Sequence, residues 1–200
     1  MDRPIIVFAC DLTEGGCELG PETKARCDVA TQRVQEYKNR REKGFLIVSA
    51  GMSDKRKYPQ QEKLMSVMMR DYLVSIGVPS EQVILGKPVW GSRGELQEAL
   101  RIILGRQMYI FHPAIIWKDG RGIVRDGEDF CLGSWSEYHI DMVSGWYHKW
   151  RLIYLSRKVR KMIPLSRRKD KWHIQFLATK GSFKSFLWEL IKLPTALVRR

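Results

Sequence analysis

The chain has 200 residues, of which 44% are hydrophobic, and this is the size and composition of one globular domain with a substantial core. Its net charge of +13 favours anionic partners such as phosphate groups, nucleic acid or anionic lipid, although a solvated basic surface would give the same charge. The sequence has no apolar run of about 18 residues and no signal-peptide pattern, which excludes a transmembrane helix and favours a cytoplasmic protein.

Short β-rich runs alternate with longer helical patterns, which is typical of an α/β sheet. The first run, residues 5–10, is apolar throughout, as expected of a strand that helices cover on both faces. A Gly-rich acidic loop and an amphipathic helix follow it. The elements predicted before residue 105 are a strand at 5–10, a helix at 23–43, a strand at 45–48, a helix at 61–75, a strand at 82–85 and a helix from 92.

The helix that starts near residue 92 carries a predicted N-terminal cap. Ser92 is followed three residues later by Glu95, which is the spacing of a capping box. In this interpretation Ser92 is the N-cap of a helix whose free N–H groups point outward. Glu95 either completes the capping box or is a catalytic candidate that orients His148 or an arginine.

Residues 105–137 interrupt the alternation and are predicted to form an inserted hairpin or lid. The segment is apolar and β-rich at 109–117 and turn-like at 118–127. The whole pattern predicts one domain over 1–200, a three-layer Rossmann-like α/β sandwich with a mostly parallel sheet flanked by helices, and a basic C-terminal extension at 162–200. The elements predicted after the insert are a strand at 138–143, a helix at 147–161, a strand at 172–178 and a final helix at 182–193.

The sequence indicates neither a metal site nor a reactive cysteine. The four cysteines lack Cys-x-x-Cys spacing and the four histidines are scattered, so we expect no metal site. Cys10 is interpreted as a small core residue rather than a nucleophile. A carboxylate set of Asp11, Glu14 and Glu62 can be drawn, but carboxylates in polar loops are usually solvated, and no cofactor is identified.

Ligands of open parallel sheets bind beyond the carboxyl ends of the strands. Four loops of this chain place small or polar residues at such ends. Their hydroxyls and backbone N–H groups suit a polar or anionic ligand. The candidate ligand-binding residues in these loops are Asp11, Ser49, Gly51, Ser92, Ser144 and Gly145.

Two further candidates follow the strand predicted at 138–143. His148 and Arg151 are three residues apart, so they share one face of the first helical turns. An imidazole and a guanidinium at a helix N-terminus favour an anion, and Arg can hold a phosphate or carboxylate with two parallel hydrogen bonds. The imidazole also titrates near neutral pH, so His148 could transfer a proton. Ordinary helix surface is the competing interpretation.

Five motifs occur in an order that resembles the bacterial domain-of-unknown-function family typified by YdcF, SanA and ElyC. Each motif is weak alone, and the family pattern is followed over about residues 4–161 apart from the insert. The matching positions are the strand and Gly-rich loop followed by Arg26, Ser49-Ala50-Gly51, Gly-Val-Pro at 77–79, Ser92 with Glu95, and Val143-Ser144-Gly145 with His148 and Arg151.

The resemblance implies a Rossmann-like fold, a nucleotide-like or other phosphate-bearing small ligand, and a role in bacterial envelope upkeep. In that implied site Arg26 and Arg151 bind anionic groups, and His148 serves as acid, base or hydrogen-bond donor. The chain departs from the family at Ala50, where a Gly is usual, and at Ser144-Gly145, where Thr-Ser is usual. Whether the ligand is only bound or also transformed is therefore left open.

Two other functions stay open. Residues 149–171 hold ten Lys or Arg and one Asp, with Trp150 among them and Trp172 directly after them, which is a composition suited to nucleic acid or an acidic partner. The predicted helix at 182–193 has one apolar face that either packs on the sheet or lies on an anionic membrane surface.

Overall fold

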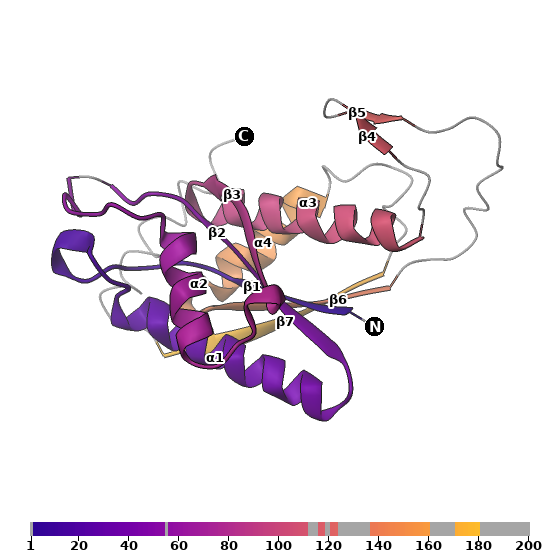
Figure 1. Ribbon diagram of the computed structural model, residues 1–200, viewed down its shortest axis with the longest axis horizontal. Coiled ribbons are helices and arrows are strands. Elements are labelled where there is room, and N and C mark those ends of the chain that lie inside the picture. Colours follow the sequence, from indigo (N-terminus) through magenta and orange to yellow (C-terminus); the bar gives the residue numbers. More distant parts are fainter. Residues whose placement is uncertain are drawn as a thin grey trace.

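The centre of the fold is a five-stranded sheet in the order β3-β2-β1-β6-β7, in which every neighbouring pair is parallel (Figure 1). The structure is a computed structural model and describes residues 2–54, 56–111, 116–118, 121–123, 137–160 and 171–180. The strands of this sheet are β1 (Asp2–Val7), β2 (Lys43–Ala50), β3 (Val83–Val89), β6 (Glu137–Gly145) and β7 (Lys171–Thr179).

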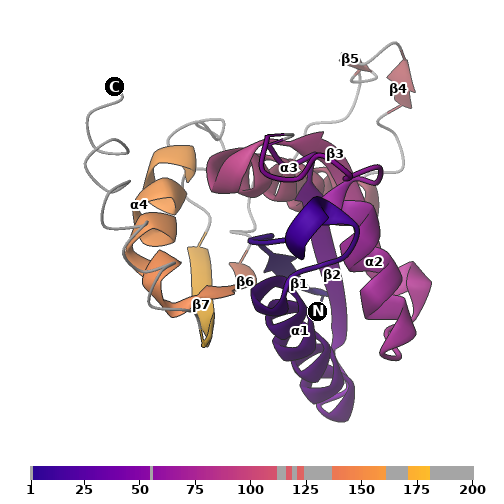
Figure 2. The ribbon, with the colours of Figure 1, turned by 90° about the vertical axis from the view of Figure 1, so that its left-hand side faces the viewer.

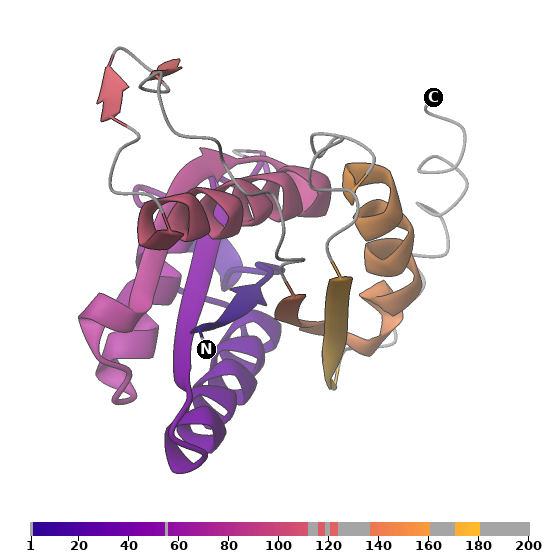
Figure 3. The same ribbon diagram turned by 90° about the vertical axis from the view of Figure 1, so that its right-hand side faces the viewer.

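Helices cover the sheet on both faces, as Figures 2 and 3 show from opposite ends. One face carries α1 (Pro21–Asn39) and α2 (Met65–Ser75), and the other carries α3 (Gly91–Phe111) and α4 (Lys149–Arg160). The predicted three-layer Rossmann-like sandwich is thereby confirmed. Short 3-10 turns lie at η1 (Glu14–Gly16), η2 (Ser80–Gln82) and η3 (Trp146–His148).

The continuous apolar run of β1 explains the two cores. Side chains of a strand alternate between faces, so a central strand with helices on both sides needs apolar residues at every position. Ile5 and Val7 pack with the α1 and α2 side chains, whereas Ile6 and Phe8 pack with those of α3 and α4. β1 is therefore fixed from both sides, and so is the position of its carboxyl end.

The strand order creates a topological switch point between β1 and β6. From β1 the chain moves outward through β2 to β3 and then returns to β6 on the opposite side of β1. Val7 pairs with Val143 in this ladder, so the loops after the two strands leave from the same edge and diverge toward opposite faces. Ligands of open α/β sheets bind at such a point.

Several predicted boundaries are wrong by a few residues. The helix expected from residue 61 begins at Met65, because the Gln61 amide bonds the Ser53 N–H (2.8 Å) and the Lys63 carbonyl (2.8 Å) in the preceding loop. β6 continues two residues beyond Val143, because β7 pairs with it as far as Thr179. The helix expected from Tyr147 is divided into η3 and α4.

The region of the predicted insert is described only in part. α3 continues to Phe111, so the β-rich run expected from Tyr109 begins as helix instead. β4 (Ile116–Lys118) and β5 (Arg121–Ile123) form a two-stranded antiparallel ladder. The helix predicted at 182–193 lies outside the described residues. Within the described part, no helix is both long and apolar enough to cross a membrane.

Candidate functional site

The candidate site lies at the carboxyl ends of β1 and β6. This edge of the sheet is on the left in Figure 1, where η1 and the loop before α2 also lie. Figure 2 shows the molecule from that side. Side chains reach it from the first turns of α1 and α3, from η3 and from the start of α4, and the following contacts define how they meet.

Arg26 connects the end of β1 to η3. Its guanidinium is fully buried, and Nη1 donates to the carbonyls of Phe8 and Ala9 at 3.0 Å each. Nη2 donates to the hydroxyl of Tyr147 at 3.1 Å. A buried guanidinium is tolerated only when it is hydrogen-bonded, and these bonds hold the backbone of β1 in place. Arg26 is therefore a structural clamp at the switch point.

Glu95 reaches the same strand end from the first turns of α3. Its Oε2 accepts a hydrogen bond from the backbone N–H of Ala9 at 3.0 Å. Burial raises the pKa of this carboxyl to about 7, while the Ala9 N–H and the positive charges of Arg26 and Arg151 act in the opposite direction. Glu95 therefore exchanges a proton near neutral pH in a site where two guanidinium groups are within electrostatic range.

The predicted N-cap at Ser92 is wrong. α3 begins at Gly91, whose φ of +67° lies in the left-handed region, so buried Ser92 sits inside the first helical turn. The carboxylate of Glu95 instead accepts a hydrogen bond from Ala9, which follows β1. The spacing that resembled a capping box thus places a carboxyl at the switch point.

Ser144 and His148 are hydrogen-bonded to each other. Ser144 Oγ lies 3.0 Å from His148 Nδ1, across the turn from the end of β6 to the end of η3. Ser144 is fully buried and His148 is nearly so. The hydrogen bond fixes the orientation of the imidazole ring. Ser144 and His148, which were predicted as separate site residues, thus form one unit.

Tyr147 joins this unit to α1 through a second hydrogen-bond network. Its hydroxyl donates to Glu22 Oε2, and its ring makes an edge contact with His148 at 4.8 Å between centroids. Cys10 Sγ donates to the same Glu22 oxygen at 3.1 Å and lies 3.5 Å from the Tyr147 hydroxyl. Glu22 is also within 3.8 Å of Arg26, one helical turn later. The network connects the loops after β1 and β6.

Two side chains of this network, Cys10 and Tyr147, have raised pKa values. Desolvation raises the pKa of the Cys10 thiol to about 11, against the attraction of Arg26. Desolvation and the hydrogen bond to Glu22 also raise the pKa of Tyr147 well above its usual value. Both groups are therefore protonated at neutral pH and act as hydrogen-bond donors. The Cys10 residue is exposed, so its prediction as a small core residue is wrong.

Gly145 is needed for this geometry. A Cβ at this position would lie 2.6 Å from Cε1 and 3.0 Å from the hydroxyl of Tyr147. Its φ of −60° is open to any residue, so the restriction comes only from the Tyr147 ring that folds back over the strand end. Tyr147 and Glu22 were not predicted as site residues; the only signal was Glu22 four residues before Arg26.

Three predicted binding residues have other surroundings. Asp11 Oδ1 accepts hydrogen bonds from the Thr23 N–H and hydroxyl at 2.9 Å each, so its carboxylate satisfies the N-terminus of α1. Ser49 is buried at the end of β2, and the Gly51 N–H donates to the carbonyl of Val89 at 3.0 Å. β2 lies on the side of β1 away from β6, so these two residues are farther from the switch point.

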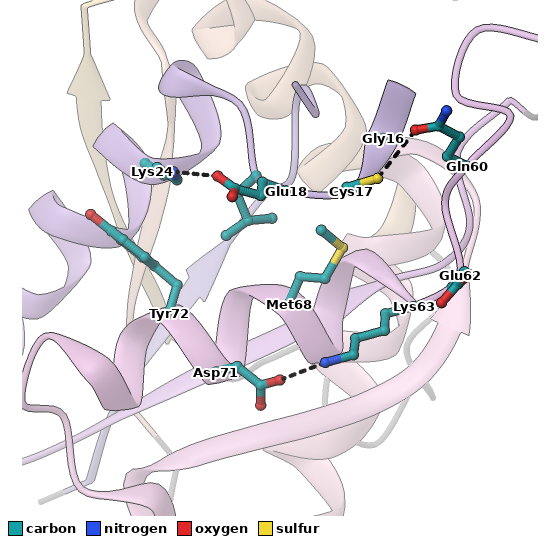
Figure 4. A pocket seen from close by; sticks show the side chains of 11 residues that line it. Gly16, Cys17, Glu18, Lys24, Gln60, Glu62, Lys63, Met68, Asp71 and Tyr72 are labelled. Carbon is teal, nitrogen blue, oxygen red and sulfur yellow. Dashed lines mark hydrogen bonds and ion pairs between the residues drawn. The ribbon is translucent and has the colours of Figure 1, made fainter. Parts of the chain in front are cut away.

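A groove of about 580 Å³ lies elsewhere, between η1, the loop before α2 and α2 itself (Figure 4). It shares no residue with the switch-point cluster. Lys24 pairs with Glu18 at 3.5 Å and Lys63 with Asp71 at 4.0 Å along its walls. Glu62 is exposed at its edge, and no group of three or more potential ligands for a metal occurs among the described residues.

No protein-family model matches this chain, and neither a curated protein nor a solved structure matches it.

Proposed function

We propose that the chain binds a small anionic ligand, nucleotide-like or otherwise phosphate-bearing, at the carboxyl ends of β1 and β6. The observation that carries the proposal is a buried carboxyl at a topological switch point, bonded to the Ala9 N–H at the end of β1 and within electrostatic range of two guanidinium groups. Such a combination supplies positive charge and a proton-exchanging group where α/β proteins usually bind ligands. The resemblance to YdcF, SanA and ElyC, with its implied envelope role, stays a prediction.

Arg26 and Arg151 have different parts in this proposal. The described hydrogen bonds of Arg26 go to protein atoms and its side chain is fully buried, so it positions the strand end and contributes charge. Arg151 is only partly buried on the first turn of α4. It is the guanidinium that can approach a ligand phosphate and hold it with two parallel hydrogen bonds.

Glu95 and His148 are the proton-transfer candidates if the ligand is also transformed. With a pKa of about 7, Glu95 can act as either acid or base at neutral pH. In this proposal it exchanges a proton with a ligand that Arg151 holds. The Ser144 hydroxyl is hydrogen-bonded to His148 Nδ1, so the imidazole ring is oriented for proton exchange with a ligand.

A thermal-shift measurement with adenosine monophosphate, S-adenosylmethionine, sugar phosphates and inorganic phosphate tests the proposal. Ligand at about 100 times its Kd stabilises a protein by about 3 kcal/mol, which is roughly 5–10 °C in Tm for a chain of this length. Arg151→Ala should lose most of that shift. Arg157→Ala, an exposed arginine on the same helix, should keep it. An equal shift in wild type and Arg151→Ala would refute the site.

Nucleic-acid binding through residues 149–171 is the second candidate, and one observation speaks against part of it. Trp172 stacks on Tyr138 at 4.5 Å between ring centroids, because the two residues are opposite each other in the β6–β7 ladder. One face of that ring is therefore covered by Tyr138, which leaves less of it for stacking on a base. Binding of a single-stranded oligonucleotide that falls steeply with salt, and survives Arg151→Ala, would favour this candidate.

A further inference from the structure

Three tryptophans are unusually exposed in this structure. Trp90, Trp146 and Trp150 have exposed fractions of 69%, 46% and 70%. Tryptophan carries a large apolar surface and is normally well buried, so three such side chains in solvent need an explanation. The other exposed large hydrophobic residues among the described ones are aliphatic: Val74, Ile76, Leu85 and Ile174.

The sheet register brings the tryptophans to one edge. Val89 pairs with Ala50 at the end of the β2–β3 ladder, and Gly145 pairs with Thr179 at the end of the β6–β7 ladder. In the β1 ladders Ile6 is opposite Ile47 of β2, and Val7 is opposite Val143 of β6. Counting three and two residues further along these pairs places Ala50 and Gly145 at the level of Ala9. Trp90 and Trp146 therefore leave the sheet at the same level, about 14 Å apart for three strand spacings.

Both tryptophans lead into helices on the same face. Trp90 directly precedes α3, Trp146 begins η3, and Trp150 lies on the first turn of α4. α3 and α4 pack against each other and cover one face of the sheet, as Figure 3 shows. The loops after β1 and β2 turn instead to the face that carries α1 and α2. The three rings thus belong to the α3/α4 side of the carboxyl edge.

The exposed charges of the segments at this edge are positive, and the carboxyls of Glu95 and Glu98, which follow on α3, are buried. Residues 87–94, 144–151 and 179–180 contain five Lys or Arg and no Asp or Glu. By contrast, residues 10–20 and 51–64, which serve the other side of the edge, contain five acids and four Lys or Arg. Lys149 lies 5.9 Å from the Trp150 ring, so cation and aromatic ring are neighbours. The charge of the α3/α4 side is complementary to an anionic surface.

We propose that this aromatic and basic rim, made of Trp90, Arg93, Trp146, Lys149, Trp150 and Lys180, docks onto the headgroup region of an anionic lipid bilayer. Tryptophan prefers the membrane–water interface, where its ring meets the acyl boundary and its N–H stays hydrated. Each Lys or Arg close to an anionic leaflet adds attraction. The rim is independent of the proposed ligand and would direct the switch-point site toward lipid headgroups.

A membrane explains the rim better than nucleic acid does. Single-strand binding needs a basic groove in which successive bases stack on closely spaced rings. Trp90 and Trp146 are instead separated by about three strand spacings at the ends of two helices, which suits insertion at separate points of a broad surface. The helix predicted at 182–193, for which a membrane surface was one of two alternatives, is a different segment and lies outside the described residues.

Co-sedimentation of the full chain with vesicles tests the rim. We expect binding to phosphatidylcholine vesicles that contain phosphatidylglycerol and weak binding to phosphatidylcholine alone. The double variant Trp90→Ala/Trp150→Ala should lower the partition coefficient at least tenfold, since each ring buries enough apolar area for roughly a tenfold effect. Lys149→Glu should weaken binding to the anionic vesicles only. Trp146 is kept because its ring contacts Tyr147.

Val74→Ala/Ile76→Ala is the matched control, because these exposed side chains lie at the end of α2 away from the rim. It should bind vesicles as the wild type does. Unchanged binding by the tryptophan variant, or an equal loss in the control, would overturn the proposal. So would quenching of wild-type tryptophan fluorescence by a single-stranded oligonucleotide but not by brominated anionic lipid.

Discussion

Replacing Glu95 by Gln should stabilise the protein, and the gain should grow as the pH rises from 5 to 8. The folded pKa of about 7 lies above the ordinary value of 4.5, so the folded state keeps a proton that the unfolded state releases between these values. Stability therefore falls as pH rises from 4.5 to 7. At 1.36 kcal/mol for each tenfold change in proton affinity, the loss approaches about 3 kcal/mol above pH 7.

Glutamine removes this loss and keeps the acceptor for the Ala9 N–H. Urea unfolding at pH 5 and pH 8 measures the effect as the difference between variant and wild type at each pH. The gain from Glu95→Gln should be about 1 kcal/mol at pH 5 and about 3 kcal/mol at pH 8. Comparing the variant with wild type at the same pH removes the contribution of the other titrating groups, which the two proteins share.

Glu98, one turn later on the same helix, provides a control of opposite sign. The Arg101 guanidinium and the Lys87 N–H (2.8 Å) hold the pKa of this buried carboxyl below its usual value. Glu98→Gln should therefore destabilise the protein by an amount that stays constant from pH 5 to pH 8. A gain for Glu95→Gln that does not grow with pH would refute the assignment of a buried, nearly neutral carboxyl at the switch point.

Two further predictions concern the network around Tyr147. Gly145→Ala should destabilise the protein by about 1–3 kcal/mol, because the added Cβ displaces the Tyr147 ring. The double variant Gly145→Ala/Tyr147→Ala should lose less stability than the sum of the two single variants. Thermal unfolding of all three variants measures both effects. Cys10, with a pKa of about 11, should react with iodoacetamide at pH 7 roughly a hundredfold more slowly than an unperturbed thiol. Glu22→Gln should accelerate that reaction in mass-spectrometric time courses, and an unchanged rate would contradict the proposed network.

The fold was predictable because its signals are local. Apolar runs of strand length alternating with helical periodicity require only neighbouring residues, and all five strands of the sheet were located within a few positions. The predicted ends of helices and strands were wrong where contacts with other segments set them. β6 extends through Gly145 because β7 pairs with it, and α2 starts late because Gln61 bonds the preceding loop.

The site could be predicted only in part for the same reason. His148 and Ser144 are four residues apart, and their contact follows from one turn of chain. Glu95 meets Ala9 across 86 positions, and Tyr147 meets Glu22 across 125, so no local pattern reveals either contact. The sequence also could not distinguish Trp172, which stacks on Tyr138, from Trp150, which faces solvent.

Because Arg26 is buried, Arg26 and Arg151 have different roles from those expected from the sequence. Sequence motifs suggest equal anion-binding roles, but a guanidinium that holds two strand carbonyls and a tyrosine hydroxyl cannot turn toward a ligand without leaving those acceptors unpaired. Its charge still acts on Glu95 and Glu22 from a fixed position. In the proposed function, direct contact with the ligand is therefore assigned to Arg151, which is partly buried at the start of α4, next to Trp150 of the rim.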